Sequence, residues 1–165
     1  MSEYLSFNDT VSVISSIINK KLNNQIIIKE QVKKLKPDAY TPKLINNNCK
    51  ELYALYTVKD GVETDKMIIH PYGNLLIKTG IAITWDNSNY NIQILPNPNL
   101  KFKNIISQEC IIEHNYKQEI GILLHNNTGR SFDFRKGDCI AQYNYIRVII
   151  QIKIEEEVVE EFNLP

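Results

Sequence analysis

An all-β domain with a short helix in front of it is the fold that this 165-residue sequence predicts. Three observations lead to that fold class. The chain contains short apolar runs, turn signals lie between them, and after residue 24 the apolar residues no longer follow the helical spacing of the N-terminal stretch. The apolar runs recur at the interval typical of a β-sandwich or jelly roll. They cover residues 25–35, 52–58, 67–69, 75–83, 90–95, 104–106, 120–124, 131–134 and 140–154. With 43% hydrophobic residues and 165 residues in all, the chain is long enough to bury one hydrophobic core but too short for two domains.

The N-terminal stretch, residues 8–22, has the apolar spacing of a helix. Its apolar residues recur at intervals of three and four, behind Asn8 and Asp9 as possible caps. They are Val11, Ile14, Ile17, Ile18 and Leu22. Because Val and Ile are stiff at χ1, a strand is the competing interpretation. We predict a helical extension over residues 1–24.

Turn signals separate the apolar runs that follow. They are Lys59-Asp60-Gly61, Pro71-Tyr72-Gly73, Asn126-Asn127-Thr128-Gly129 and Lys136-Gly137-Asp138. Glycine and proline interrupt regular structure at such points, so each run reads as a separate strand. We therefore expect a β domain over residues 25–154. The acidic residues 155–161 are typical of a solvated arm, which we place at residues 155–165.

Charge and cysteine content exclude several functional classes. Lys plus Arg equal Asp plus Glu at 19 each, so no global field favours nucleic acid. Cys49, Cys110 and Cys139 are odd in number and lack a Cys-x-x-Cys pair, which argues against a disulfide framework and a zinc site. No apolar run approaches the roughly 20 residues that span a bilayer, and the N-terminal residues Met-Ser-Glu-Tyr do not have the pattern expected of a basic leader. We expect a cytoplasmic protein without nucleic-acid or membrane partners.

Two segments carry a family resemblance. Residues 111–120 read Ile-Ile-Glu-His-Asn-Tyr-Lys-Gln-Glu-Ile, and residues 137–142 read Gly-Asp-Cys-Ile-Ala-Gln. Their order and spacing resemble the dUTPase family, whose motifs read Gly-Val-Ile-Asp-x-x-Tyr-x-Gly-Glu and Gly-Asp-x-Ile-Ala-Gln. Residues 68–81 are similar to that family's Pro-x-x-x-x-Leu-x-x-Thr-Gly hairpin. The resemblance covers residues 28–163 and implies a homotrimer of jelly-roll subunits, with active sites built from more than one chain.

The resemblance also suggests roles for particular residues. Glu113 matches the carboxylate base that activates water, one methylene longer than the family's Asp, and Glu51 matches a carboxylate of the magnesium shell. Tyr116 matches the tyrosine that packs under the deoxyribose. Gln142 matches an amide on the phosphate side, and Glu119 is the carboxylate that closes the Tyr116 motif. A packed tyrosine in a β-hairpin and a strand entering the core would explain these residues equally well.

The phosphate-binding motifs depart from the family pattern. Where the family has Pro-Arg-Ser-Gly-Leu-Ala, residues 95–101 read Leu-Pro-Asn-Pro-Asn-Leu-Lys, so Asn97 and Pro98 replace Arg and Ser. Pro98 also removes an N–H donor. A glycine-rich C-terminal flap has no counterpart, because no glycine follows Gly137. Losing these groups could remove several kcal/mol of transition-state stabilisation.

Three functions remain open on this evidence. The leading hypothesis is a trimeric, non-hydrolysing protein that binds or sequesters a nucleotide, as in viral or phage counter-defence in a host cytoplasm. Its expected ligand-binding residues are Tyr116, Glu113, Glu119, Gln142, Asn97 and Lys101, with no metal site of its own and Mg²⁺ present only with a triphosphate. The alternative is an active, divergent dUTP pyrophosphatase that uses Glu113 and Glu51, with Lys101 or Lys103 replacing the missing Arg. The third is a module that binds a protein partner.

Overall fold

The computed structural model describes residues 7–22, 25–150 and 152–157. It contains a long helix, a short helix and fourteen strands in that part of the chain. The helices are α1 (Phe7–Leu22) and α2 (Pro98–Phe102). The strands are β1 (Glu30–Lys34), β2 (Lys43–Leu44), β3 (Cys49–Tyr53), β4 (Tyr56–Lys59), β5 (Val62–Thr64), β6 (Met67–Ile69), β7 (Asn74–Lys78), β8 (Ile81–Trp85), β9 (Tyr90–Pro96), β10 (Ile105–Ser107), β11 (Cys110–Ile112), β12 (Gly121–Asn126), β13 (Phe132–Phe134) and β14 (Cys139–Arg147).

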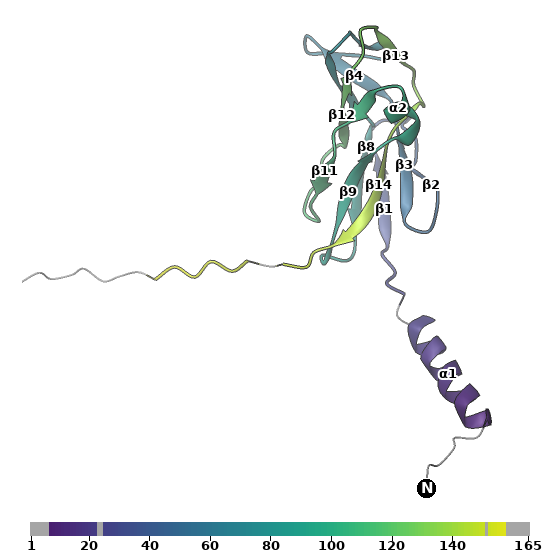
Figure 1. The fold of residues 1–165 in the computed structure, drawn as a ribbon. Coiled ribbons are helices and arrows are strands. Elements are labelled where there is room, and N and C mark those ends of the chain that lie inside the picture. The colour runs from purple at the N-terminus through teal and green to yellow at the C-terminus, as the bar shows by residue number, and fades with distance from the viewer. Residues whose placement is uncertain (1–6, 23–24, 151, 158–165) are drawn as a thin grey trace, which may run out of the picture.

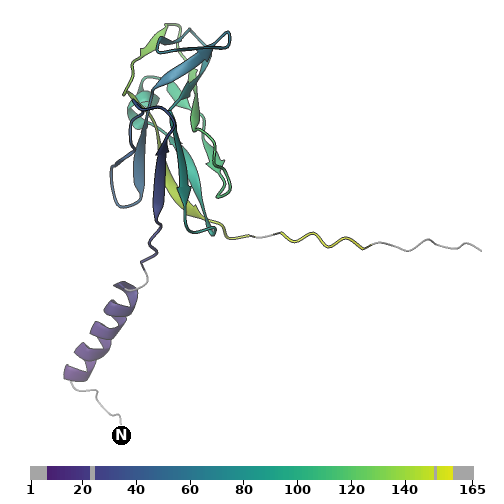
Figure 2. The ribbon, with the colours of Figure 1, turned by 180° about the vertical axis from the view of Figure 1, so that it is seen from behind.

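Two antiparallel five-stranded sheets form the body of the molecule (Figures 1 and 2). One has the order β10-β12-β7-β4-β5, and the other has the order β11-β9-β14-β3-β2. Two further pairs, β1-β8 and β13-β6, extend the sandwich. Within the described residues the fold is mostly β, so the predicted fold class is confirmed.

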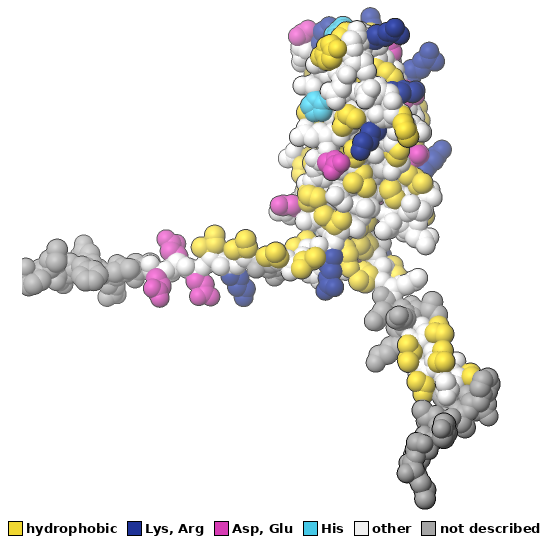
Figure 3. All heavy atoms as spheres, in the orientation of Figure 1, with side chains coloured by type: hydrophobic (Ala, Val, Ile, Leu, Met, Phe, Trp, Pro, Cys, Tyr) yellow, Lys and Arg dark blue, Asp and Glu magenta, His cyan; other side chains and the backbone are white. Residues whose placement is uncertain are grey.

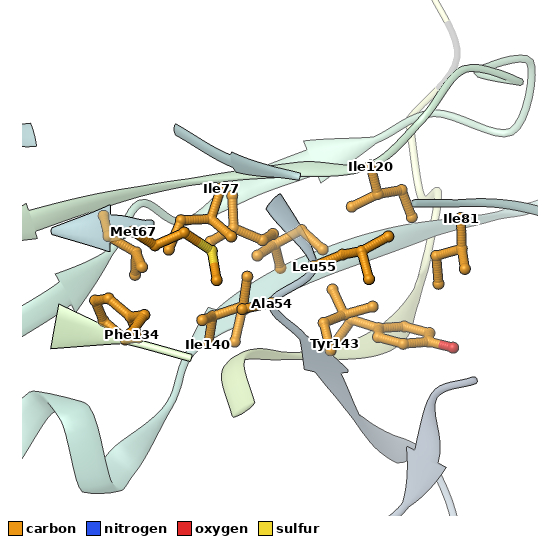
Figure 4. Packing of buried hydrophobic residues seen from close by; sticks show 14 of the residues in the cluster. Ala54, Leu55, Met67, Ile77, Ile81, Ile120, Phe134, Ile140 and Tyr143 are labelled. Carbon is orange, nitrogen blue, oxygen red and sulfur yellow. The ribbon is translucent and has the colours of Figure 1, made fainter. Parts of the chain in front are cut away.

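The core lies between the two sheets and is built mainly from isoleucine (Figure 4). Ile77 and Ile122 enter it from one sheet, and Ile92 and Tyr143 enter it from the other, each with 0–1% of its surface exposed. β-Branched side chains suit this position because they pack well on a pleated surface. The alternating burial of β12 follows from the two-residue period of a strand.

The predicted strands at residues 52–58 and 75–83 are each two strands in the structure. The first run changes sheets at Ala54 and Leu55, which are buried between β3 and β4. The second run turns at Gly80, whose φ of +70° is favourable for glycine. A Cβ atom on Gly80 would lie 2.4 Å from Leu55 Cδ2, so the turn packs directly on the sheet crossing.

The predicted last strand, residues 140–154, is too long. β14 ends at Arg147, which pairs with Tyr90, the first residue of its neighbour β9. Beyond that point no described strand offers hydrogen-bond partners, so the chain leaves the sheet (Figure 1). Ile149, Ile152 and Ile154 are consequently 84–90% exposed.

A buried carboxylate joins β1 to the sheet that contains β14. Glu30 Oε1 accepts hydrogen bonds from Lys50 Nζ at 2.7 Å and Tyr143 Oη at 2.9 Å, and its Oε2 accepts one from Tyr145 Oη at 2.7 Å. The Glu30 side chain is only 9% exposed. Burial, together with the charge of Glu30, raises the pKa of Tyr143 and Tyr145 above their ordinary value. The two hydroxyls therefore remain protonated donors.

Helix α1 confirms the predicted N-terminal helix, and the competing strand interpretation of this stretch is wrong. It projects from the end of the sandwich near the start of β1 (Figures 1 and 2). Among the described helices, none has the length and hydropathy required to cross a membrane.

Candidate functional site

The hairpin between β11 and β12 forms a pocket of about 520 Å³. Glu113 and Tyr116 both line it, together with Asn115 and Lys117. The Tyr116 backbone N–H donates to the Glu113 carbonyl at 3.0 Å, and the Tyr116 hydroxyl donates to the Glu119 carbonyl at 2.9 Å. These two bonds hold the ring across the loop, with 38% of Tyr116 exposed. The structure thus places the expected base and the expected sugar-packing tyrosine in one concave site.

Glu119 faces away from this pocket, although its neighbours Gln118 and Ile120 line it. Its carboxylate accepts hydrogen bonds from the Tyr56 hydroxyl at 2.8 and 2.9 Å and from the Gly80 N–H at 2.9 Å. It therefore anchors the hairpin to the β7-β8 turn. Burial, followed by the hydrogen bond to Glu119, raises the pKa of Tyr56 above its ordinary value. The Tyr56 hydroxyl therefore remains a protonated donor.

Glu51 and Gln142 form a second group on the neighbouring strands β3 and β14. Gln142 of β14 lies directly opposite Glu51 of β3, so the two side chains lie on the same face of the sheet. Glu51 Oε2 accepts a hydrogen bond from the Tyr53 hydroxyl at 2.7 Å, and Gln142 Oε1 accepts a weak one from Cys49 Sγ at 3.6 Å. Both residues are half-buried, so their polar ends remain accessible from this face.

Asn97 ties the short helix α2 to β14. Its Oδ1 accepts a hydrogen bond from the Asn99 N–H at 2.8 Å, which caps the helix, and its Nδ2 donates to the Cys139 carbonyl at 2.9 Å. With only 5% of its surface exposed, Asn97 positions the α2 turn against the strand. Lys101 lies in the last turn of α2 and is exposed.

A pocket of about 480 Å³ lies beside α2 and brings together cations that are distant in sequence. Asn97, Lys103 and Arg135 line it, with Asp138 and Cys139. The Arg135 N–H donates to Asp138 Oδ2 at 2.8 Å, which fixes the turn before β14, and Lys103 lies over the Phe132 ring at 5.7 Å. Arg135 is not among the site residues predicted from the sequence. The only sequence signal was a cation beside the Lys136-Gly137-Asp138 turn.

Cys139 lines this pocket and occupies the unspecified position of the Gly-Asp-x-Ile-Ala-Gln motif. Burial, followed by the charge of Glu51, raises the pKa of its thiol to about 11. The thiol is therefore neutral at physiological pH and supplies no positive charge. Positive charge in this pocket comes from Lys103 and Arg135, and the carboxylates Asp133 and Asp138 line the same pocket.

The two groups of predicted site residues lie far apart within one subunit. Glu113 follows β11, which is three strands away from β3 and Glu51 in the same sheet. The pairings Ile112↔Ile92 and Gln142↔Leu95 also place the two sites several residues apart along the strands. Strand spacings of about 4.8 Å and a rise of about 3.3 Å per residue give a separation of roughly 19 Å. Glu113 and Glu51 cannot act on the same phosphate within one subunit.

Magnesium is the cofactor that the family resemblance implies. In the part of the chain that the structure describes, no group of three His, Cys, Asp or Glu residues could hold a metal ion. Mg²⁺ bound with a nucleotide, however, needs only one or two carboxylates besides phosphate oxygens and water. Glu51 fits that requirement, because its Oε1 accepts no hydrogen bond from the described residues while Oε2 is held by Tyr53.

Comparison with known proteins shows the family of this chain. The dUTPase family model matches residues 60–163. The deoxyuridine 5'-triphosphate nucleotidohydrolase of Clostridium tetani is 34% identical over 129 residues, covering 76% of this chain and 83% of that protein. The chain belongs to the dUTPase family. The fowlpox virus enzyme of the same name is 31% identical over 113 residues, covering 68% of this dUTPase-family chain and 73% of its own length.

Solved structures show the same fold for this dUTPase-family chain. A mutant dUTPase from phage phi11 of S. aureus, described with a structural Mg(II) ion, has a TM-score of 0.62 at 17% identity. The match covers 82% of this chain and 99% of the phage phi11 chain. The dUTPase of Staphylococcus bacteriophage 80alpha with dUPNHPP has a TM-score of 0.61 at 18% identity, with coverage of 82% and 90%.

These relatives correct the leading functional hypothesis. The prediction of a non-hydrolysing, nucleotide-sequestering pseudoenzyme is wrong, because the relatives that match most of this chain at 33–34% identity are named as nucleotidohydrolases. They favour the alternative of an active dUTP pyrophosphatase. The matching proteins come from bacteria and viruses alike, so they give no support to a specifically viral role.

Proposed function

We propose that this protein hydrolyses dUTP to dUMP and pyrophosphate. The observation that carries the proposal is the joint placement of Glu113 and Tyr116 in one pocket of about 520 Å³. That volume lies within the range of about 300–1,000 Å³ that is usual for small-molecule sites. The 34% identity to a deoxyuridine triphosphate nucleotidohydrolase selects the substrate class.

Glu113 acts as the general base in the proposed reaction. Its carboxylate takes a proton from water, and the water oxygen forms a bond to phosphorus as the anhydride bond between the α- and β-phosphates breaks. Pyrophosphate leaves with the electron pair of that bond. Glu113 is exposed at the hairpin and has the reach of one extra methylene compared with Asp. Tyr116 packs beneath the sugar from the same pocket.

Lys103 and Arg135 neutralise the triphosphate in place of the missing family arginine. They line one pocket with Asn97, beside the α2 turn. Phosphoryl transfer depends on positioning and charge neutralisation, so a cation contributes wherever the fold places it near the phosphates. Glu51 would supply one carboxylate ligand to a magnesium ion bound with the nucleotide, and that ion would add positive charge at the phosphate oxygens.

A homotrimer brings the two groups together. Within one subunit Glu113 and Glu51 are separated by roughly 19 Å, as the strand spacings above require. A neighbouring subunit can present its β11-β12 hairpin to the Glu51, Gln142 and Lys103 surface. Each active site then contains the base of one chain and the phosphate-binding residues of another. Trimers are typical of the family to which the chain belongs.

The test is pyrophosphate release from dUTP by the full chain with MgCl₂, compared with the Glu113→Gln variant. Removing a general base lowers kcat by about 10²–10⁴-fold. Glu109→Gln is the matched control, since Glu109 is an exposed carboxylate four residues earlier that lies outside the described pockets. We expect it to retain activity.

Two outcomes would overturn the proposal. The first is an absence of dUMP and pyrophosphate above the enzyme-free blank at saturating dUTP. The second is equal activity of Glu113→Gln and the unmodified chain, which would remove Glu113 from the reaction.

A further inference from the structure

Helix α1 carries an apolar stripe that no other described part of the chain covers. Val11, Ile14 and Ile18 are 45–50% exposed, although they lie at spacings of three and four along one side of the helix. Figure 3 shows hydrophobic side chains on the surface of this helix, away from the sandwich. Such a stripe on a projecting helix marks an interaction surface.

The composition of α1 indicates that the helix is marginal without a partner. Residues 10–18 contain five β-branched apolar residues and three serines, which are weaker helix formers than Ala, Leu or Glu. Isolated helices shorter than about 12–15 residues are marginal in water even with good helix formers, and α1, with 16 residues, is only slightly longer. This stretch also contains no charged side chain, so neither a basic nor an acidic partner is selected by charge complementarity.

The apolar spacing matches a coiled-coil seam over one heptad. With Val11 at heptad position a, Ile14 falls at d and Ile18 at the next a. The exposed Ile17 lies beside this seam at g, Val13 falls at the outer position c, Ser12 and Ser16 fall at b and f, and the next d position is Lys21. β-Branched residues at both a and d favour three or more strands over two. We propose that α1 packs with the α1 helices of two other copies of this chain as a parallel three-helix coiled coil.

This inference rests on the trimer proposed above. Rotational symmetry places the same residue of each copy at the same height, so the three helices run parallel and Ile14 meets Ile14. Lys29 is attached to the sandwich through its N–H bond to Asp86 Oδ1 at 2.9 Å. Six residues separate Leu22 from Lys29 in the sequence, and a stretch of that length can span at most about 20 Å, which would allow each helix to reach its partners. Tethering the helices to one trimer raises their effective concentration to about the millimolar range.

Docking of α1 on its own sandwich fits the structure less well. A pocket on the sandwich that is lined by Ile26, Ile28 and Leu44, and also by polar residues such as Asn47 and Lys50, has a volume of about 280 Å³. That space accommodates one or two side chains. A helix of 16 residues is about 24 Å long and about 10 Å wide. A pocket of that size cannot cover the whole stripe.

Cysteine cross-linking of the full chain tests the proposal. Ile14→Cys places a thiol on the seam, and Ser16→Cys places one on the outer face as the matched control. Cα atoms more than about 7 Å apart cannot be bridged, so the seam variant should cross-link between chains at least tenfold faster. The unmodified chain, with its exposed Cys110, sets the background. Light scattering of the same samples measures the oligomeric state independently.

The results distinguish failure of the coiled-coil proposal from failure of the trimer proposal. Rapid cross-linking of Ile14→Cys alone, in a sample of trimeric mass, supports the coiled coil. Equal rates for the two variants in a trimer would overturn the coiled coil and leave the trimer intact. A monomeric mass would overturn both. Helix protection in hydrogen exchange without cross-linking would show that α1 docks on its own domain, which also contradicts the proposal.

Discussion

Replacing Glu30 with alanine removes the acceptor at the centre of a buried hydrogen-bond network. The change deletes hydrogen bonds from Lys50, Tyr143 and Tyr145 that are 2.7–2.9 Å long. Each bond to a charged group contributes about 1.5–3 kcal/mol. Relief of the buried carboxylate's desolvation offsets part of this loss, and Lys50, at 26% exposure, regains water contacts. Tyr143 is completely buried and regains none.

We therefore expect Glu30→Ala to lower the free energy of unfolding by about 3–5 kcal/mol, as for other broken buried ion pairs. In a domain of this size each kcal/mol moves Tm by about 2–4 °C, so the shift is roughly 10 °C. Differential scanning calorimetry at a fixed protein concentration measures it, because oligomer stability depends on concentration.

Glu63→Ala is the matched control for this experiment. Glu63 forms an ion pair with Lys36 at 2.8 Å, a distance close to that of the Glu30–Lys50 pair. Its side chain is 55% exposed, however, so water replaces the lost bond and Tm should change little. Equal Tm values for Glu30→Ala and Glu63→Ala would refute the argument that burial of the network determines its contribution.

Three further predictions concern other parts of the molecule. Burial is the main reason that the pKa of Tyr143 lies above its ordinary value of 10.0. The free energy of unfolding that Tyr143 contributes is therefore complete below pH 10 and falls above pH 10 by up to about 1.4 kcal/mol per pH unit. Stability should decline less steeply with rising pH in Tyr143→Phe, and an identical decline in both proteins would contradict this. Gly80→Ala should lower the free energy of unfolding by about 2–4 kcal/mol, because alanine there is strained at positive φ and also overpacks the site. Gly61 has a φ of +77° but open space around it, so Gly61→Ala should lower the free energy of unfolding in urea titrations only by the cost of the φ strain. Arg135→Ala should raise the KM for dUTP at least tenfold relative to Arg130→Ala, and unchanged steady-state kinetics would remove Arg135 from the phosphate site.

Much of the sandwich could be read from local sequence patterns. The predicted run at residues 67–69 coincides with β6, and the run at 90–95 coincides with most of β9. The short strands β5 and β11 were missed, although the equally short β6 was predicted. The overlong strand at residues 140–154 has strong β composition throughout. Its end depends on where the neighbouring strand begins.

The candidate site was only partly predictable. The motif spacing located Glu113 and Tyr116, and both line one pocket. Motif comparison also led to the wrong functional hypothesis, since it counted the missing arginine as lost charge. A phosphate responds to the position of a cation in space and not to its position in the chain. Lys103 and Arg135 are 32 residues apart and still line one pocket.

By itself, the sequence determined the all-β class, the N-terminal helix and the family, because periodicity, turn residues and motif order are local properties of the chain. Only the tertiary structure decided which polar residues act together. It directs Glu119 into the hairpin anchor and separates Glu113 from Glu51 by several strand spacings within one subunit. The physical reason is that strand pairing and sheet order are long-range choices. They depend on which apolar faces can be buried together, and no short segment contains that information.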